Sequence, residues 1–144
     1  MLKPINVGET FEYVLKSEKK VNDPNPTIFV LSVLDSIIKT KLTDLGMVYR
    51  YNPDAPKDSV AEARMNIAEQ ELEFVRFGLK EIKNFKDSKG NDIKIKTVKR
   101  MVGHTEYDII SDDILKLIPR FAIKEIADEI VKNNEISEED RKNS

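Results

Sequence analysis

Apolar and polar residues alternate with a period of two near the start of the chain. Between Thr10 and Lys16 the large apolar side chains share one face, at Phe11, Tyr13 and Leu15. This alternation predicts a half-buried strand. A second strand is predicted from Thr27 to Leu31, which is apolar almost throughout. The polar stretch between them, Ser17 to Pro26, is predicted to be a loop, so the two strands should pair as a loose antiparallel hairpin.

Helical periodicity begins after the second strand. Ser32 is a candidate N-cap, and one predicted face carries Leu34, Ile37, Ile38, Leu42 and Leu45. Gly46 is expected to end this helix. The following stretch, Met47 to Asp58, contains two prolines and is predicted to be a loop with a short extended piece at its start.

The strongest periodic signal follows an S-x-x-E capping box formed by Ser59 and Glu62. Apolar residues then recur every three or four positions, at Ala61, Met65, Ala68, Leu72, Val75, Leu79 and Ile82. This stripe predicts one long amphipathic helix from Val60 to Lys83. The stripe either packs on the chain's own strands and helices or docks a helix of another protein. The candidate partner-binding residues are Leu72, Val75, Leu79, Ile82 and Phe85.

The remaining chain predicts a turn at Asn84–Asp92, β-structure at Ile93–Val102 and a helix starting at Ser111. The apolar residues of that helix include Leu117, and Pro119 fits the first turn of a further helix, whose apolar side starts at Phe121 and which fades at Asn133 and Asn134. The expected fold is α+β, with a small antiparallel β-sheet packed against the long helix and a C-terminal helical pair. We expect one domain over residues 1–134 and a mobile polar tail over residues 135–144.

Composition narrows the chemistry. The chain has 144 residues, of which 40% are hydrophobic and 35% charged, as expected for one soluble domain rather than a disordered or membrane protein. It has no cysteine and one histidine, which excludes thiolate chemistry and disfavours a histidine-based metal site or triad. No phosphate-binding glycine loop is present. We therefore expect a protein that is not an enzyme, with no cofactor, no metal and no catalytic residue; His104 is expected on the surface.

Charge is distributed unevenly, although the net charge is only −2. Residues 79–100 carry eight basic and three acidic side chains, whereas residues 105–144 carry six basic and eleven acidic ones. The basic segment is either a nucleic-acid face or a partner that neutralises the acidic segment. Only Phe85 interleaves with the basic residues, whereas single-strand binders need several stacking aromatic residues, so nucleic acid is not the expected partner. Whether residues 79–100 contact nucleic acid is left open by the sequence.

Three stretches of the sequence resemble a loose family of small proteins from the structural gene clusters of tailed bacteriophages and prophages. They are KPINVGETFEYVL with DPNPTIFVL (residues 3–31), VRFGLKEIKNFKDSKGN (75–91) and ILKLIPRFAIKEIADEIVKNNEISEEDRKNS (114–144). The resemblance is to tail assembly chaperones or to structural components encoded beside them. It implies a non-enzymatic role in the cytoplasm of the bacterial host, binding the tape-measure protein or tail-tube subunits, with homo-oligomerisation possible and no membrane involved.

Two other functions stay open at the level of sequence. A virion structural subunit, such as a head–tail or tail component, would be present in the mature virion, whereas a chaperone would be absent from it. A phage-encoded inhibitor of a host defence protein would mimic nucleic acid through its acidic residues, and the acidic C-terminal segment is the support for that reading.

Overall fold

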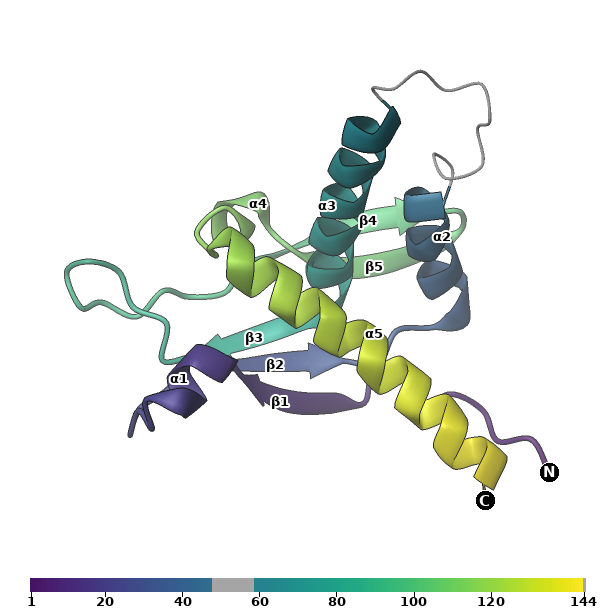
Figure 1. Ribbon diagram of the computed structural model, residues 1–144, viewed down its shortest axis with the longest axis horizontal. Coiled ribbons are helices and arrows are strands. Elements are labelled where there is room, and N and C mark those ends of the chain that lie inside the picture. Colours follow the sequence, from purple (N-terminus) through teal and green to yellow (C-terminus); the bar gives the residue numbers. More distant parts are fainter. Residues whose placement is uncertain (48–58, 144) are drawn as a thin grey trace.

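The computed structural model describes the backbone of residues 1–47 and 59–143, and the side chains of residues 1–45 and 67–133. The strands are β1 (Thr10–Val14), β2 (Ile28–Ser32), β3 (Leu79–Lys83), β4 (Thr97–Val102) and β5 (Thr105–Ile110). The helices are α1 (Lys16–Lys20), α2 (Ser36–Met47), α3 (Ser59–Gly78), α4 (Asp112–Leu115) and α5 (Arg120–Asn143). In Figure 1, α5 runs diagonally across a sheet of order β1-β2-β3, and the β4–β5 hairpin lies beside α3. The predicted α+β class is confirmed.

The N-terminal hairpin is confirmed, with β1 and β2 antiparallel from Thr10 opposite Ser32 to Val14 opposite Ile28. Tyr13 and Leu15 are buried as the alternation predicts. The predicted loop after β1 is wrong at its start, where α1 forms one short helix. Its first backbone hydrogen bonds run from the N–H groups of Glu18 and Lys19 to the carbonyl of Leu15. A helix of five residues is too short to show a periodic pattern.

The helix predicted from Ser32 begins later, because Ser32 is the last residue of β2. The N-cap is Asp35, whose Oδ1 accepts a hydrogen bond from the N–H of Ile38 at 2.8 Å. Leu34, Ile38 and Leu42 are buried as predicted, but Ile37 is 64% exposed and Leu45 37% exposed. Gly46 does not end the helix, since α2 runs through Met47. The extended piece predicted after Met47 lies outside the described residues.

The long helix predicted to reach Lys83 ends at Gly78, and the chain continues as β3. Strand β3 pairs with β2, and a bulge separates Glu81, opposite Val30, from Leu79, opposite Leu31. Lys80 is the extra residue in that interval, so Leu79 and Ile82 point to the same side although they are three positions apart. A β-bulge therefore produced the three-residue spacing that the sequence analysis attributed to a helix.

The β-structure predicted at Ile93–Val102 forms as β4, but it does not join the three-stranded sheet. It pairs with β5, from Thr97 opposite Ile110 to Val102 opposite Thr105. The sequence analysis missed β5. Gly103, with φ +61°, opens the two-residue turn between the strands, a conformation that glycine adopts readily.

The C-terminal helical pair is confirmed, but its boundaries differ from the prediction. Ser111 stands at the N-cap of α4, yet its side chain makes no capping hydrogen bond. Pro119 precedes α5, and its carbonyl accepts hydrogen bonds from the N–H groups of Ala122 and Ile123. The predicted end at Asn134 is wrong, because α5 continues as helix to Asn143.

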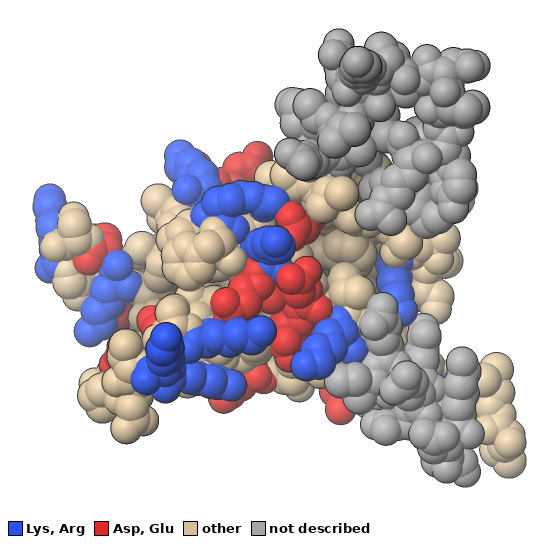
Figure 2. Space-filling model, in the orientation of Figure 1, with Lys and Arg blue, Asp and Glu red and all other residues tan. Residues whose placement is uncertain are grey.

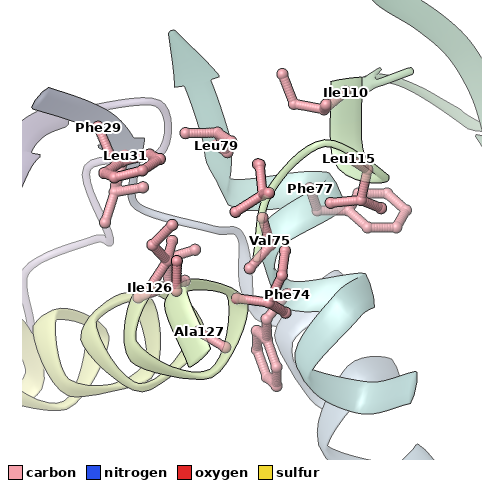
Figure 3. Close-up of a cluster of buried hydrophobic side chains, with 14 of the residues drawn as sticks. Phe29, Leu31, Phe74, Val75, Phe77, Leu79, Ile110, Leu115, Ile126 and Ala127 are labelled. Atoms are coloured by element: carbon pink, nitrogen blue, oxygen red, sulfur yellow. The ribbon is translucent and has the colours of Figure 1, made fainter. Parts of the chain in front are cut away.

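One core unites the elements. Figure 3 shows side chains from β2, α3, β3, β5, α4 and α5 converging on Val75, which is 0% exposed. Helix α3 and helix α5 come closest at Gly78, where a Cβ atom would lie 2.6 Å from Cδ1 of Ile130. None of the helices in the described part of the chain is long and apolar enough to cross a bilayer.

Candidate partner-binding surface

The predicted partner-binding residues lie in or against the core of this chain. Val75, Leu79 and Ile82 are 0%, 1% and 7% exposed. Leu72 and Phe85 are partly buried and pack against the same cluster. The structure gives these side chains a packing role within the domain, which is the first of the two interpretations of the stripe. Their role in binding a partner stays a prediction, and it would require the core to open.

An exposed apolar pair lies where α4 leads into α5. Leu117 is 48% exposed and Phe121 is 58% exposed, whereas their neighbours Ile114, Leu115 and Ile118 are buried. We call Leu117 and Phe121, with the flanking Lys116, Arg120 and Lys124, the Leu117–Phe121 patch. Aromatic and basic residues together are typical of protein-binding sites, where an aromatic anchor supplies most of the energy.

Phe121 faces outward because of helical geometry, whereas Leu117 lies in the turn between α4 and α5. At 3.6 residues per turn, Phe121 points about 160° away from Ile123, one of the buried residues of α5. Ala122, Ile123 and Ile126, each at most 2% exposed, occupy the face toward the core. The sequence analysis counted Leu117 and Phe121 among the apolar residues of the two helices and so missed the patch. The phase of Phe121 was the signal that could have identified it.

Ion pairs hold the backbone beneath the patch. Arg120 donates a hydrogen bond from Nη2 to Oε1 of Glu71 at 2.5 Å, and Glu71 is only 9% exposed. Further along α5, Oε2 of Glu125 accepts hydrogen bonds from the Tyr13 hydroxyl at 2.5 Å and from the N–H of Lys16 at 2.9 Å. Burial, together with the bond to Glu125, raises the pKa of Tyr13, so the phenol stays protonated. These contacts fix α5 against α3 and β1, so Phe121, at the start of α5, is presented by a helix anchored to the core.

A second polar network, the hairpin clamp, attaches β4–β5 to α3. It consists of Glu73, Arg76, Arg100 and Asp112. Glu73 accepts from Arg76 Nε at 2.9 Å and from Arg100 Nη1 at 2.8 Å, and Arg76 also pairs with Asp112. Arg100 lies over the Phe77 ring, with its Cζ 5.6 Å from the centroid.

Aromatic contacts continue the hairpin clamp toward α2. The rings of Phe77 and Tyr107 meet edge to face at 5.5 Å between centroids. The Tyr107 hydroxyl donates to Oδ2 of Asp35 at 2.8 Å, and burial and this bond raise the pKa of Tyr107. Because Asp35 also caps α2, one carboxylate joins the hairpin to that helix.

The hairpin clamp should make part of the folding stability depend on pH. The hydrogen bond from Arg76 lowers the pKa of Asp112 below its ordinary value. A carboxyl with a lowered folded pKa stabilises the fold above its unfolded pKa, and this contribution is lost as the pH falls through the folded pKa. We expect the urea midpoint of Asp112→Asn to fall less than that of the wild type between about pH 6 and about pH 3. Equal losses in both proteins would contradict this role.

The structure offers little for catalysis. A depression of about 350 Å³ lies beside the hairpin clamp, and its lining includes Arg76, Arg100 and Asp112, which already pair within the chain. No group of three metal-ligating side chains occurs among the residues with described positions. His104 is exposed in the turn between β4 and β5. The expectation that the protein is not an enzyme stays a prediction.

Comparison with known proteins found no relative of this chain. The chain matches no family model, no curated protein and no solved structure.

Proposed function

We propose that this chain is a non-enzymatic protein-binding protein that acts as a tail assembly chaperone of a tailed bacteriophage. The resemblance of residues 3–31, 75–91 and 114–144 to such chaperones supports the class of partner, a tape-measure or tail-tube protein. The Leu117–Phe121 patch supports the binding role. It provides exposed apolar surface on a rigid helix, while the stripe from Leu72 to Ile82 is engaged in the core.

The patch suits an apolar helix of a partner. Burying a large apolar side chain contributes about 1.5–3 kcal/mol, so the two residues together provide enough for weak, reversible association. Lys124 is exposed beside them and has no ion-pair partner among the described residues, which favours acidic residues flanking the apolar face of the partner. Such a helix-on-helix contact suits a chaperone that releases its client during assembly.

The test measures binding of candidate tape-measure segments and tail-tube subunits by calorimetry. We expect Leu117→Ser combined with Phe121→Ser to weaken binding at least about tenfold, since the two half-exposed side chains together contribute more than about 1.4 kcal/mol. The matched control is Ile37→Ser, which removes an apolar side chain that is 64% exposed on α2. The control should bind like the wild type.

Three outcomes would contradict the proposal in different ways. If the wild type bound none of these proteins, the assignment of the partner would be wrong. If the double variant bound normally, the patch would not be the binding surface. If mass spectrometry found the chain in purified mature virions, the virion-subunit alternative would replace the chaperone.

A further inference from the structure

One end of the molecule is rich in exposed lysines. Helix α1 carries Lys16 and Lys20, and the loop from Asn84 to Lys96 carries Lys86, Lys89, Lys94 and Lys96. The two segments lie at the same end in Figure 1, and basic side chains gather there in Figure 2. Thr27 links the two segments, because its N–H donates to Oε2 of Glu18 on α1 at 3.0 Å and its Oγ1 donates to the carbonyl of Asn84 at 2.9 Å. We call these six residues the lysine end.

The loop that carries four of these lysines is an ordered turn. The N–H of Asp87 donates to the carbonyl of Asn91 at 2.9 Å, and the N–H of Ile93 donates to the carbonyl of Phe85 at 2.8 Å. Oδ1 of Asp87 accepts the N–H groups of Lys89 and Asn91. Phe85 and Ile93 pack against the core at its base. The backbone that carries these lysines is therefore ordered before any ligand arrives, which lowers the entropy cost of binding.

The lysine end differs from the arginines with described side chains, and from Lys99, in lacking carboxylate partners. Arg76, Arg100 and Arg120 all form ion pairs, as does Lys99. None of the six lysines has a carboxylate oxygen within 4.0 Å among the described residues.

Three of the acidic side chains nearby are occupied by other contacts, and a fourth, Asp92 in the loop itself, forms no ion pair with a described lysine. Glu18, Asp23 and Asp87 accept hydrogen bonds from backbone N–H groups. Lys83 pairs with Glu12, and Lys19 lies over the Tyr13 ring. Neither Lys83 nor Lys19 is counted in the lysine end. The six ammonium groups thus remain available to an external anion.

We propose that the lysine end binds the phosphate backbone of double-stranded nucleic acid without reading its sequence. Six lysines and no arginine supply point charges and no planar fork for base recognition. Among the described residues of α1 and the loop 84–96, and directly after them, Val21 is the large apolar side chain that is exposed. One such residue does not form the apolar centre that a protein interface has. Phe85 is turned toward the core, so no stacking platform serves a single strand.

The experiment uses the full chain and a fluorescently labelled DNA duplex of about 20 base pairs, in two unrelated sequences, at about 50 mM salt. We expect equal affinity for both duplexes and a steep loss of affinity as salt rises. The variant replaces Lys86, Lys89, Lys94 and Lys96 with Gln. It should lower the slope of log affinity against log salt by about 4, roughly one unit for each lysine.

A matched control separates local contacts from overall charge. It replaces Lys3, Lys39, Lys41 and Lys132 with Gln, which changes the net charge by the same amount away from the lysine end (Figure 1). The control should bind DNA nearly as well as the wild type, and both variants should keep the wild-type melting curve.

Several outcomes would overturn the proposal. These are absence of DNA binding by the wild type at low salt, equal loss in the control variant, and a stronger preference for one duplex sequence. Polyglutamate and anionic lipid vesicles serve as competitors of the labelled duplex. If polyglutamate displaced it at a lower concentration of negative charges than unlabelled duplex does, the lysine end would bind an acidic protein. The same result with vesicles would assign it to a membrane surface. None of these readouts depends on the Leu117–Phe121 patch, so this proposal and the chaperone proposal can fail separately.

Discussion

Val75→Asp should unfold the domain at room temperature. The side chain of Val75 is 0% exposed and lies among residues of α3, β3 and α5 that form the centre of the core. A carboxylate placed there has no partner, and an uncompensated buried charge costs about 3–5 kcal/mol. The lost burial of the valine side chain adds about 1.5–3 kcal/mol. The sum of about 4.5–8 kcal/mol matches the whole stability of a domain in the lower part of the usual range of about 5–15 kcal/mol. Urea unfolding followed by circular dichroism measures the effect.

Two further substitutions make this test specific. Leu72→Asp on the same stripe should destabilise the fold less, because Leu72 is only partly buried. Phe121→Asp should leave the unfolding midpoint nearly unchanged, because Phe121 is 58% exposed. If Val75→Asp kept the wild-type melting temperature while losing a partner, the stripe would be an exposed docking face, and its burial in the core would be wrong.

Gly78→Ala should also destabilise the protein, although alanine usually strengthens a helix by about 0.5–1 kcal/mol relative to glycine. The new Cβ would lie 2.6 Å from Cδ1 of Ile130, 3.2 Å from its Cγ1 and 3.3 Å from its Cγ2. Ile130 is 0% exposed, so it has no free space into which it can turn. Overpacking of a core costs about 1–3 kcal/mol, and we expect a net loss in this range.

A double-mutant cycle identifies the clash as the cause. Ile130→Val removes the Cδ1 atom and alone should cost about 0.5–1.5 kcal/mol. Combined with Ile130→Val, the Gly78→Ala change should be nearly neutral, giving a favourable coupling energy of about 1 kcal/mol or more. Additive losses would show that Gly78 is required for another reason, such as the geometry with which α3 passes into β3.

The elements with simple periodicity could be predicted from sequence, and the transitions between elements could not. The alternation at Phe11, Tyr13 and Leu15 predicted β1 correctly because a strand buries every second residue. The passage from α3 to β3 was missed because the bulge at Lys80 maintains a three-residue spacing between Leu79 and Ile82. Gly78 was the residue in the sequence that marked the end of α3. A glycine is needed there because the side chain of Ile130 on α5 occupies the space that a Cβ atom would take.

For the candidate surfaces too, the sequence shows the residue types, and only the fold shows which of them lie together. The charges that form the lysine end are visible in the sequence, but only the fold brings α1, with Lys16 and Lys20, to the same end as the loop after Asn84, through the contacts of Thr27. The Leu117–Phe121 patch was missed because apolar residues near a helix start were assigned to its buried side. The hairpin clamp was beyond sequence reasoning, since its charges come from α3, β4 and α4 and meet only in the folded chain.

The bond between Tyr13 and Glu125 joins residues 112 positions apart, so the first strand and the last helix depend on each other during folding. On the ribosome, β1 and β2 emerge long before α5, and their apolar face has no cover until the C-terminal third has been made. Folding is slowed because the chain loses entropy in closing such a long loop before the contacts that offset this loss have formed. Strand edges stay exposed in the meantime. The nascent chain is therefore most prone to aggregate between synthesis of the first hairpin and docking of α5.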